Sequence, residues 1–182
     1  MFATAKENKL RHLDFLFKAT RPELIRAGAV VLVFGIFGLM FNTQFGVFLD
    51  LSETRCMPEH VYLGYPRRDE LERGDIVSFR ASNRIMFDLM SGKRIAKIIA
   101  GVAGDYVTSN ENGAFVNGVK VGERNPISLQ NLNAKNKSPI NMDRVLLPGE
   151  LFLVGTLPRS FDSRYWGVAS ALSVDRLILP IF

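Results

Sequence analysis

The chain has 182 residues, of which 47% are hydrophobic and 10% aromatic, and its formal net charge is +5. This hydrophobic content excludes a disordered chain, and the mean hydropathy of +0.10 predicts that some apolar surface faces something other than water. One cysteine excludes a disulfide framework within the chain, and two histidines argue against a histidine-based metal centre. The composition therefore predicts one small domain without metal or cofactor, attached to a membrane.

An uncharged stretch from Ala27 to Leu49 is the first predicted element. It is 23 residues long and is interrupted only by the polar residues Asn42, Thr43 and Gln44. A helix needs about 20 apolar residues to cross the hydrocarbon core of a bilayer. We therefore predict a transmembrane anchor over residues 27–49.

Flanking charges predict the orientation of this anchor. Basic residues precede it, and the first charge after it is an aspartate; they are Lys6, Lys9, Arg11, Lys18, Arg21 and Arg26 before, and Asp50 after. The positive-inside rule then places residues 1–26 in the cytoplasm, either as a helix on the membrane surface or as a solvated tail. Residues 50–182 would lie across a bacterial inner membrane, in the periplasm of a Gram-negative host. A cleavable signal peptide is disfavoured, because bulky residues occupy the position of a cleavage site.

Residues 50–182 read as short β-strands separated by turns, which predicts a mainly β fold: a compact antiparallel sheet or partly closed barrel. The clearest signal is a hairpin at Asn117-Gly118, between alternating apolar residues. The other expected strands lie at 60–64, 75–79, 95–102, 105–108, 151–155 and 177–179. Residues 123–144 are polar and aperiodic, which indicates a surface excursion. Residues 85–90 are apolar and could form a short core helix or dip into the membrane surface.

Cys56 is the first candidate for chemistry, in the sequence Cys56-Met57-Pro58. A lone cysteine is more often a small buried hydrophobic residue than a nucleophile, but an unpaired thiol is a liability in an oxidising compartment. A thiol nucleophile needs a base, and His60 and Lys97 are the candidates. Apolar surroundings lower the pKa of a lysine ammonium group, and Lys97 is the only lysine within a strongly apolar run, 95–100. The alternative is that Lys97 points to solvent from an ordinary strand.

Three blocks in order resemble the signal peptidase I family of membrane-anchored Ser-Lys peptidases. Cys56-Met57-Pro58 is similar to its Ser-Met-Pro nucleophile box, with cysteine in place of serine. Residues 97–105, KIIAGVAGD, resemble the box that holds its general-base lysine, and Arg73-Gly74-Asp75 matches an intervening strand. Residues 155–167 resemble its closing box, with Thr-Leu-Pro-Arg where the family has an Asp-Asn pair.

The resemblance implies a role for each matching residue. Cys56 would be the nucleophile and Lys97 the general base, which predicts an endopeptidase with a Cys-Lys dyad that removes leader peptides from exported precursors. The Cys56 backbone N–H and the Thr54 hydroxyl would stabilise the oxyanion. Ser160 would orient the lysine. Asp162 and Arg164 would form a supporting ion pair.

The small domain resembles one subgroup in particular, the TraF-type conjugative transfer peptidases, which mature pilin subunits. Only 49 residues separate Asp105 from Gly155, whereas housekeeping members of the family carry a larger insertion there. In that subgroup the reaction can extend to joining the ends of the pilin into a ring. The sequence does not separate transfer of the acyl group to an amine from transfer to water.

Other functions stay open at this point. The chain could be a catalytically silent, membrane-anchored assembly or binding module with a buried Cys56, or a hydrolase that uses His60 as the base of Cys56. A LexA-like self-cleaving regulator is disfavoured by the anchor and by the lack of a DNA-binding helix pair. Nucleic-acid binding has no support, because the basic residues are scattered.

Overall fold

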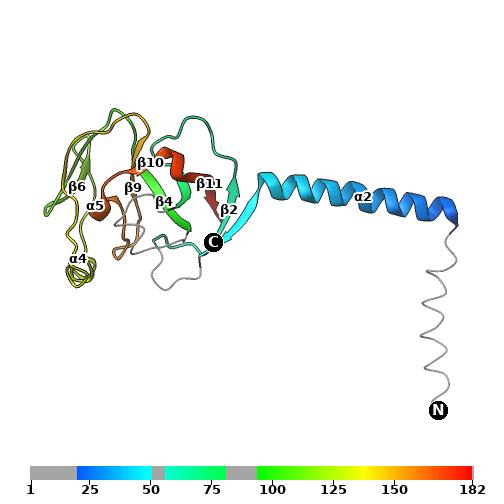
Figure 1. Ribbon diagram of the computed structural model, residues 1–182, viewed down its shortest axis with the longest axis horizontal. Helices are drawn as coiled ribbons and strands as arrows, with labels where there is room; N and C mark the ends of the chain where they lie inside the picture. Colours follow the sequence, from blue (N-terminus) through cyan, green and yellow to red (C-terminus); the bar gives the residue numbers. More distant parts are fainter. Residues whose placement is uncertain (1–19, 51–55, 81–93, 182) are drawn as a thin grey trace, which may run out of the picture. The chain divides into compact units, whose positions relative to one another are not determined.

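The computed structural model describes residues 20–50, 56–80 and 94–181. The chain divides into two compact units, Met1–Gln44 and Phe45–Phe182, which are described separately below (Figure 1). The segment 85–90, for which the sequence predicts a core helix or a membrane-surface segment, lies outside the described residues.

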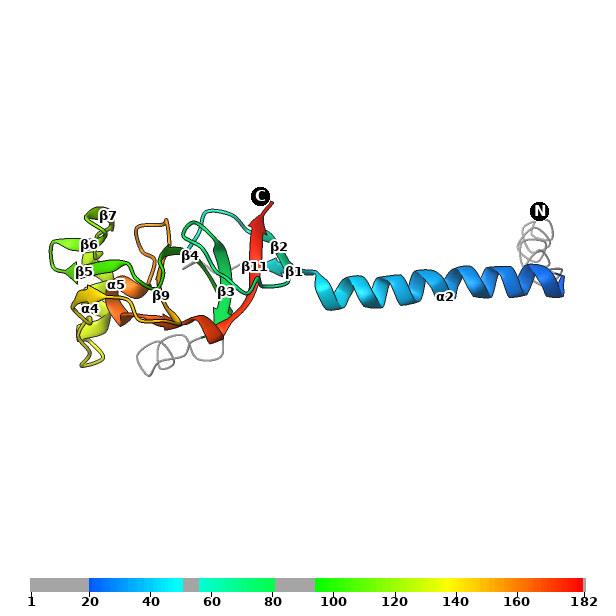
Figure 2. The same cartoon turned by 90° about the horizontal axis from the view of Figure 1, so that it is seen from above.

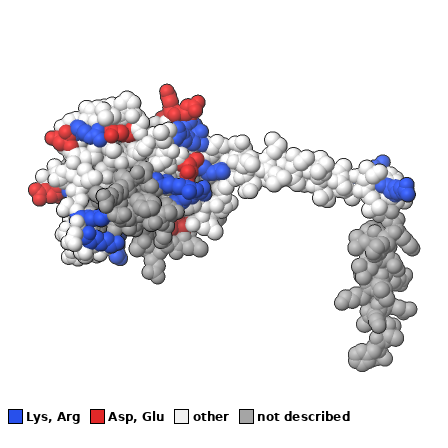
Figure 3. Space-filling view, in the orientation of Figure 1, with Lys and Arg blue, Asp and Glu red and all other residues white. Residues whose placement is uncertain are grey.

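The first unit contains helix α2, Arg21–Gln44, and none of the residues of this helix is buried. It is long and apolar enough to cross a membrane, and its surface carries no charge beyond Arg26 (Figure 3). The predicted anchor covers residues 27–49. Helix α2 begins earlier, at Arg21, and ends earlier, at Gln44. Residues 46–49, which the sequence analysis assigns to the apolar span, form a β-strand instead. The physical reason is the polar interruption at 42–44, after which the backbone pairs with a neighbouring strand.

The second unit is built on a seven-stranded antiparallel sheet with the order β1-β2-β11-β3-β4-β9-β10. Its strands are β1 (Gly46–Leu49), β2 (Val61–Tyr65), β3 (Ile76–Arg80), β4 (Arg94–Gly101), β9 (Glu150–Val154), β10 (Ala169–Ser170) and β11 (Val174–Pro180). The C-terminal strand β11 lies between β2 and β3, so the last and first parts of the domain share one sheet. The predicted mainly antiparallel β fold is confirmed.

A smaller four-stranded antiparallel sheet has the order β7-β6-β5-β8 and lies at one end of the domain (Figure 2). Its strands are β5 (Tyr106–Asn110), β6 (Gly113–Val116), β7 (Val119–Gly122) and β8 (Met142–Val145). The predicted hairpin joins β6 to β7: Asn117 and Gly118 have φ of 51° and 81°, which is the left-handed backbone of a type I′ turn.

The polar stretch 123–144 is more ordered than its aperiodic sequence predicts. It contains helix α4 (Pro126–Asn133) and strand β8. The Asn125 side chain accepts a hydrogen bond from the backbone of Ile127 and caps α4, and Pro126 occupies the first turn. Helix α5 (Ser163–Trp166) and a 3₁₀ turn, η1 (Ala171–Ser173), complete the domain. These short elements are set by capping and tertiary contacts, which leave little periodicity to read.

Candidate active site

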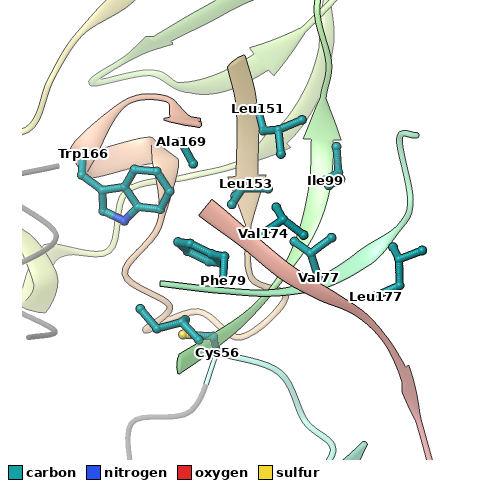
Figure 4. Close-up of a cluster of buried hydrophobic side chains, with 11 residues drawn as sticks. Cys56, Val77, Phe79, Ile99, Leu151, Leu153, Trp166, Ala169, Val174 and Leu177 are labelled. Carbon is teal, nitrogen blue, oxygen red and sulfur yellow. The ribbon is translucent and has the colours of Figure 1, made fainter. Parts of the chain in front are cut away.

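Cys56 is buried at the edge of the main hydrophobic core. Only 4% of its surface is exposed, and it belongs to the same cluster as Val77, Phe79 and Trp166 (Figure 4). The Cys56 carbonyl oxygen accepts a hydrogen bond of 3.3 Å from the backbone N–H of Leu157. This contact connects the Cys56 segment to the turn that follows β9.

Lys97 is in the middle of β4, on the face of the sheet that carries the Cys56 cluster. Side chains alternate between the two faces of a strand, and its neighbours at two residues' distance, Ile95 and Ile99, both belong to that cluster. The cross-strand partner of Lys97 is Val77, a further member. Lys97 is completely buried, which excludes the alternative of a solvent-facing lysine.

The buried Lys97 side chain has a specific partner. Its Nζ donates a hydrogen bond of 2.6 Å to Ser160 Oγ, and Ser160 is also fully buried. A buried amine without a partner would be strongly unfavourable, so this hydrogen bond is an important contact. It links the middle of β4 to a residue 63 positions later in the chain.

Gly155 allows the Cys56 segment and Ser160 to approach each other. A Cβ placed on Gly155 would lie 2.1 Å from Ser160 Oγ and 2.6 Å from the Cys56 carbonyl oxygen. No side chain fits there without moving backbone, since real Cβ atoms do not come so close to other heavy atoms. The absence of a side chain at Gly155 therefore brings the Cys56 backbone and the partner of Lys97 to one point.

A buried ion pair of Asp162 and Arg164 lies directly after Ser160 in the chain. Arg164 Nε and Nη2 donate to the two Asp162 oxygens at 2.7 Å and 2.5 Å, in the bidentate geometry that favours guanidinium–carboxylate pairs. Asp162 Oδ2 also accepts from the backbone N–H of Gly155 at 2.9 Å. Burial lowers the pKa of Arg164, but the hydrogen bonds and charge of Asp162 outweigh this effect and the net pKa is raised.

His60, the other candidate base, is not part of this group. His60 is exposed, and its Nδ1 is 3.2 Å from the carbonyl oxygen of Asp50, at the end of β1. Thr54, the predicted oxyanion donor, lies outside the described residues. Among residues 20–50, 56–80 and 94–181, no group of three or more side chains suited to hold a metal ion occurs.

Arg124 is a residue of this region that the sequence analysis missed. Its guanidinium donates to the carbonyl oxygens of Arg164 (2.7 Å) and Ile140 (2.9 Å) and to the side chain of Asn141 (2.8 Å). An isolated arginine in a polar, aperiodic stretch carries no pattern that would reveal such contacts. Only the fold brings it next to α5.

Comparison with known proteins identifies the family. The crystal structure of a signal peptidase I from Enterococcus faecalis V583 matches with 25% sequence identity over 60% of this chain and 97% of that chain, with a TM-score of 0.38. A search of curated proteins found no match. The family described as "Signal peptidase, peptidase S26" matches residues 22–176, which is most of the chain. The chain therefore belongs to the signal peptidase family, peptidase S26.

Proposed function

We propose that this protein is a membrane-anchored endopeptidase with a Cys56–Lys97 dyad, which removes leader peptides from exported precursor proteins. The observation that carries the proposal is the environment of Lys97: a fully buried lysine, held by Ser160, on the sheet face that carries Cys56. Family membership supports leader peptides as the substrate class.

The arrangement suits acyl transfer in two steps. Cys56 Sγ attacks the scissile carbonyl carbon while Lys97 Nζ accepts the thiol proton, either during attack or beforehand in a thiolate–ammonium pair. The C–N bond then breaks, the leaving amine takes the proton from Lys97, and a thioester joins the substrate to Cys56. A water molecule attacks the thioester with Lys97 as base, and the thiol is restored as the C–S bond breaks.

Cysteine in place of serine is chemically compatible with a lysine base. An ordinary thiol ionises near pH ~8.5, whereas a serine hydroxyl is far less acidic, so a thiol needs less help from its base. The Cys56 backbone N–H and the Thr54 hydroxyl are the proposed oxyanion donors. Ser160 is the proposed orienting residue, and Asp162 and Arg164 are proposed to support the segment that carries it.

The substrate is proposed to be a pilin-like precursor. The short segment between the lysine and closing boxes supports this choice, because it resembles the conjugative transfer peptidases. Acyl transfer to the amine of the same pilin, which would give a ring, is a further outcome of the same thioester. We place helix α2 in the bacterial inner membrane, with the N-terminus in the cytoplasm and residues 50–182 in the periplasm.

The dyad can be tested without a known substrate, because Cys56 is the only thiol in the chain. We would measure the rate of Cys56 alkylation by iodoacetamide against pH, in the full-length protein in detergent. Wild type would be compared with Lys97→Met and with Lys135→Met, a control at an exposed lysine of the excursion. We expect Lys97→Met alone to change the pH profile.

The opposite outcome would favour a different function. An inert Cys56, or one with the same profile in wild type and Lys97→Met, would overturn the dyad and leave a catalytically silent binding module. A profile that depends on His60 rather than on Lys97 would instead indicate a Cys-His hydrolase. The exposed position of His60 argues against that alternative.

A further inference from the structure

Two arginines connect the surface excursion, residues 123–144, to the segment that carries Ser160 through hydrogen bonds. The Arg124 side chain donates to the backbone carbonyl of Arg164 at 2.7 Å, and the Arg164 side chain donates to the backbone carbonyl of Glu123 at 2.7 Å. Arg124 thus binds the backbone of Arg164, and Arg164 binds the backbone of Glu123, the residue before Arg124. Two reciprocal charge-assisted hydrogen bonds hold a defined distance and orientation better than one contact does.

Arg124 also connects the start of the excursion to residues near its end. Residue 124 lies at its start, and the guanidinium of Arg124 reaches Ile140 and Asn141 at its end. A further contact to the side chain of the fully buried Ser109, at 3.3 Å, adds strand β5 to the same group. One half-buried guanidinium therefore fixes the excursion, β5 and α5 to one another. Burial lowers the pKa of Arg124, but arginine keeps its charge over the whole accessible pH range.

Further hydrogen bonds connect these two arginines to the candidate active site. Arg164 holds Asp162 through its bidentate pair, and its Nη2 is 3.4 Å from the carbonyl oxygen of Ser160. Asp162 in turn accepts from the backbone of Gly155, the residue that packs against Ser160 Oγ. A displaced α5 would therefore move Ser160, which is the hydrogen-bond partner of Lys97.

We propose that Arg124 is a positioning residue of the peptidase: through the carbonyl of Arg164 it holds α5, and thereby Ser160, in the place that the Lys97 side chain requires. The proposal builds on the proposed Cys56–Lys97 dyad. A further consequence is that the excursion and the dyad are mechanically coupled, so that the arrangement of residues 123–141 affects the reactivity of Cys56.

The test uses the alkylation profile of Cys56 in the full-length protein, because a purely structural role would lower the melting temperature without changing that profile below the transition. Arg124→Met is compared with Asn125→Ala, which removes the cap of α4 at the adjacent position and leaves the contacts to α5 in place. We expect Arg124→Met to lower the alkylation rate at neutral pH about tenfold and to move the profile toward that of Lys97→Met. Asn125→Ala is expected to keep the wild-type profile.

Arg124→Lys provides a milder variant in case Arg124→Met does not fold. Lysine keeps the charge but cannot reproduce the planar fork of donors, so an intermediate profile is expected. If Lys97→Met differs from wild type while both Arg124 variants match wild type, the positioning role is overturned and the dyad stands. If Lys97→Met itself matches wild type, the dyad fails first, and the positioning role fails with it. If Asn125→Ala changes the profile as much as Arg124→Met does, general loosening of the excursion explains the effect and the proposal is overturned.

Discussion

Within residues 56–80 and 94–181, the two buried basic side chains, Lys97 and Arg164, are held in opposite ways. Among the described residues the side chain of Lys97 makes one hydrogen bond, to the side chain of Ser160. The Arg164 guanidinium makes four, two of them to the carboxylate of Asp162. The Arg164 guanidinium uses four of its five N–H donors and its charge is matched by Asp162, whereas the Lys97 side chain has one uncharged partner, Ser160. This difference agrees with the proposed roles, which are proton transfer for Lys97 and support for Arg164.

The largest expected effect is on the reaction. Lys97→Met should reduce precursor cleavage by about 10²–10⁴-fold, because it removes the proposed general base, while changing the free energy of unfolding by no more than about 1 kcal/mol. Methionine fills a similar volume and avoids the burial of an amine. Mass spectrometry of a co-expressed pilin-like precursor would measure the loss of cleavage. Urea unfolding would measure the change in the free energy of unfolding. A severely destabilised Lys97→Met would show that the lysine is structural after all.

Arg164→Met should reduce stability more than Lys97→Met does. It leaves the Asp162 carboxylate buried and without its cation, so we expect about 3–5 kcal/mol less stability. Urea unfolding of the full-length protein would measure this difference. Asp162→Asn in the Arg164→Met background should restore part of the loss, because it removes the uncompensated charge. A stability close to that of wild type in the single variant would remove the distinction between the two cations.

Gly155→Ala should affect both properties at once. The added methyl group would overlap the Cys56 carbonyl oxygen and Ser160 Oγ, and we expect a loss of about 1–3 kcal/mol in stability. The Cys56 alkylation profile should change as well, because Ser160 must move. Gly46→Ala is a suitable control, because Gly46 does not have a positive φ and an added Cβ would make only ordinary van der Waals contact, at 3.8 Å, with the Arg176 side chain. Equal effects of Gly155→Ala and Gly46→Ala would contradict a specific close approach.

The smallest effect is expected at a partly exposed pair, Arg144 and Glu150. The hydrogen bond from Arg144 lowers the pKa of Glu150 below its ordinary value of 4.5, with a smaller contribution from the backbone N–H of Leu147. The associated stability is complete above pH 4.5 and is lost as the pH falls through the lowered pKa. Because solvent screens this pair, the contribution should stay below about 1 kcal/mol. Glu150→Gln should therefore flatten the acid limb of unfolding free energy against pH only slightly.

Strand positions and the apolar helix were largely predictable from local pattern. The Asn-Gly pair between alternating apolar residues predicts the hairpin of β6 and β7, because both signals lie within a few residues of the turn. The end of α2 was less predictable. The uncharged run to Leu49 is long enough and apolar enough for a membrane span. Residues 46–49 nevertheless pair with β2, and local sequence cannot predict pairing with a strand later in the chain. Helix α4 and strand β8 were missed for a related reason, since their polar sequences become ordered through caps and contacts with α5 and β5.

By itself the sequence determined the types of residue available for chemistry: one thiol, two histidines and a lysine in an apolar strand. It also carried the blocks that identify the family. Only the tertiary structure decided which of those residues share one face of the sheet, because the register of β3 against β4 aligns Lys97 with the cluster of Cys56. The family resemblance predicted that Ser160 orients Lys97, whereas the contact between Arg124 and Arg164 is seen only in the tertiary structure. Contacts between residues so far apart in the chain depend on the closure of the whole domain, and local sequence carries no record of it.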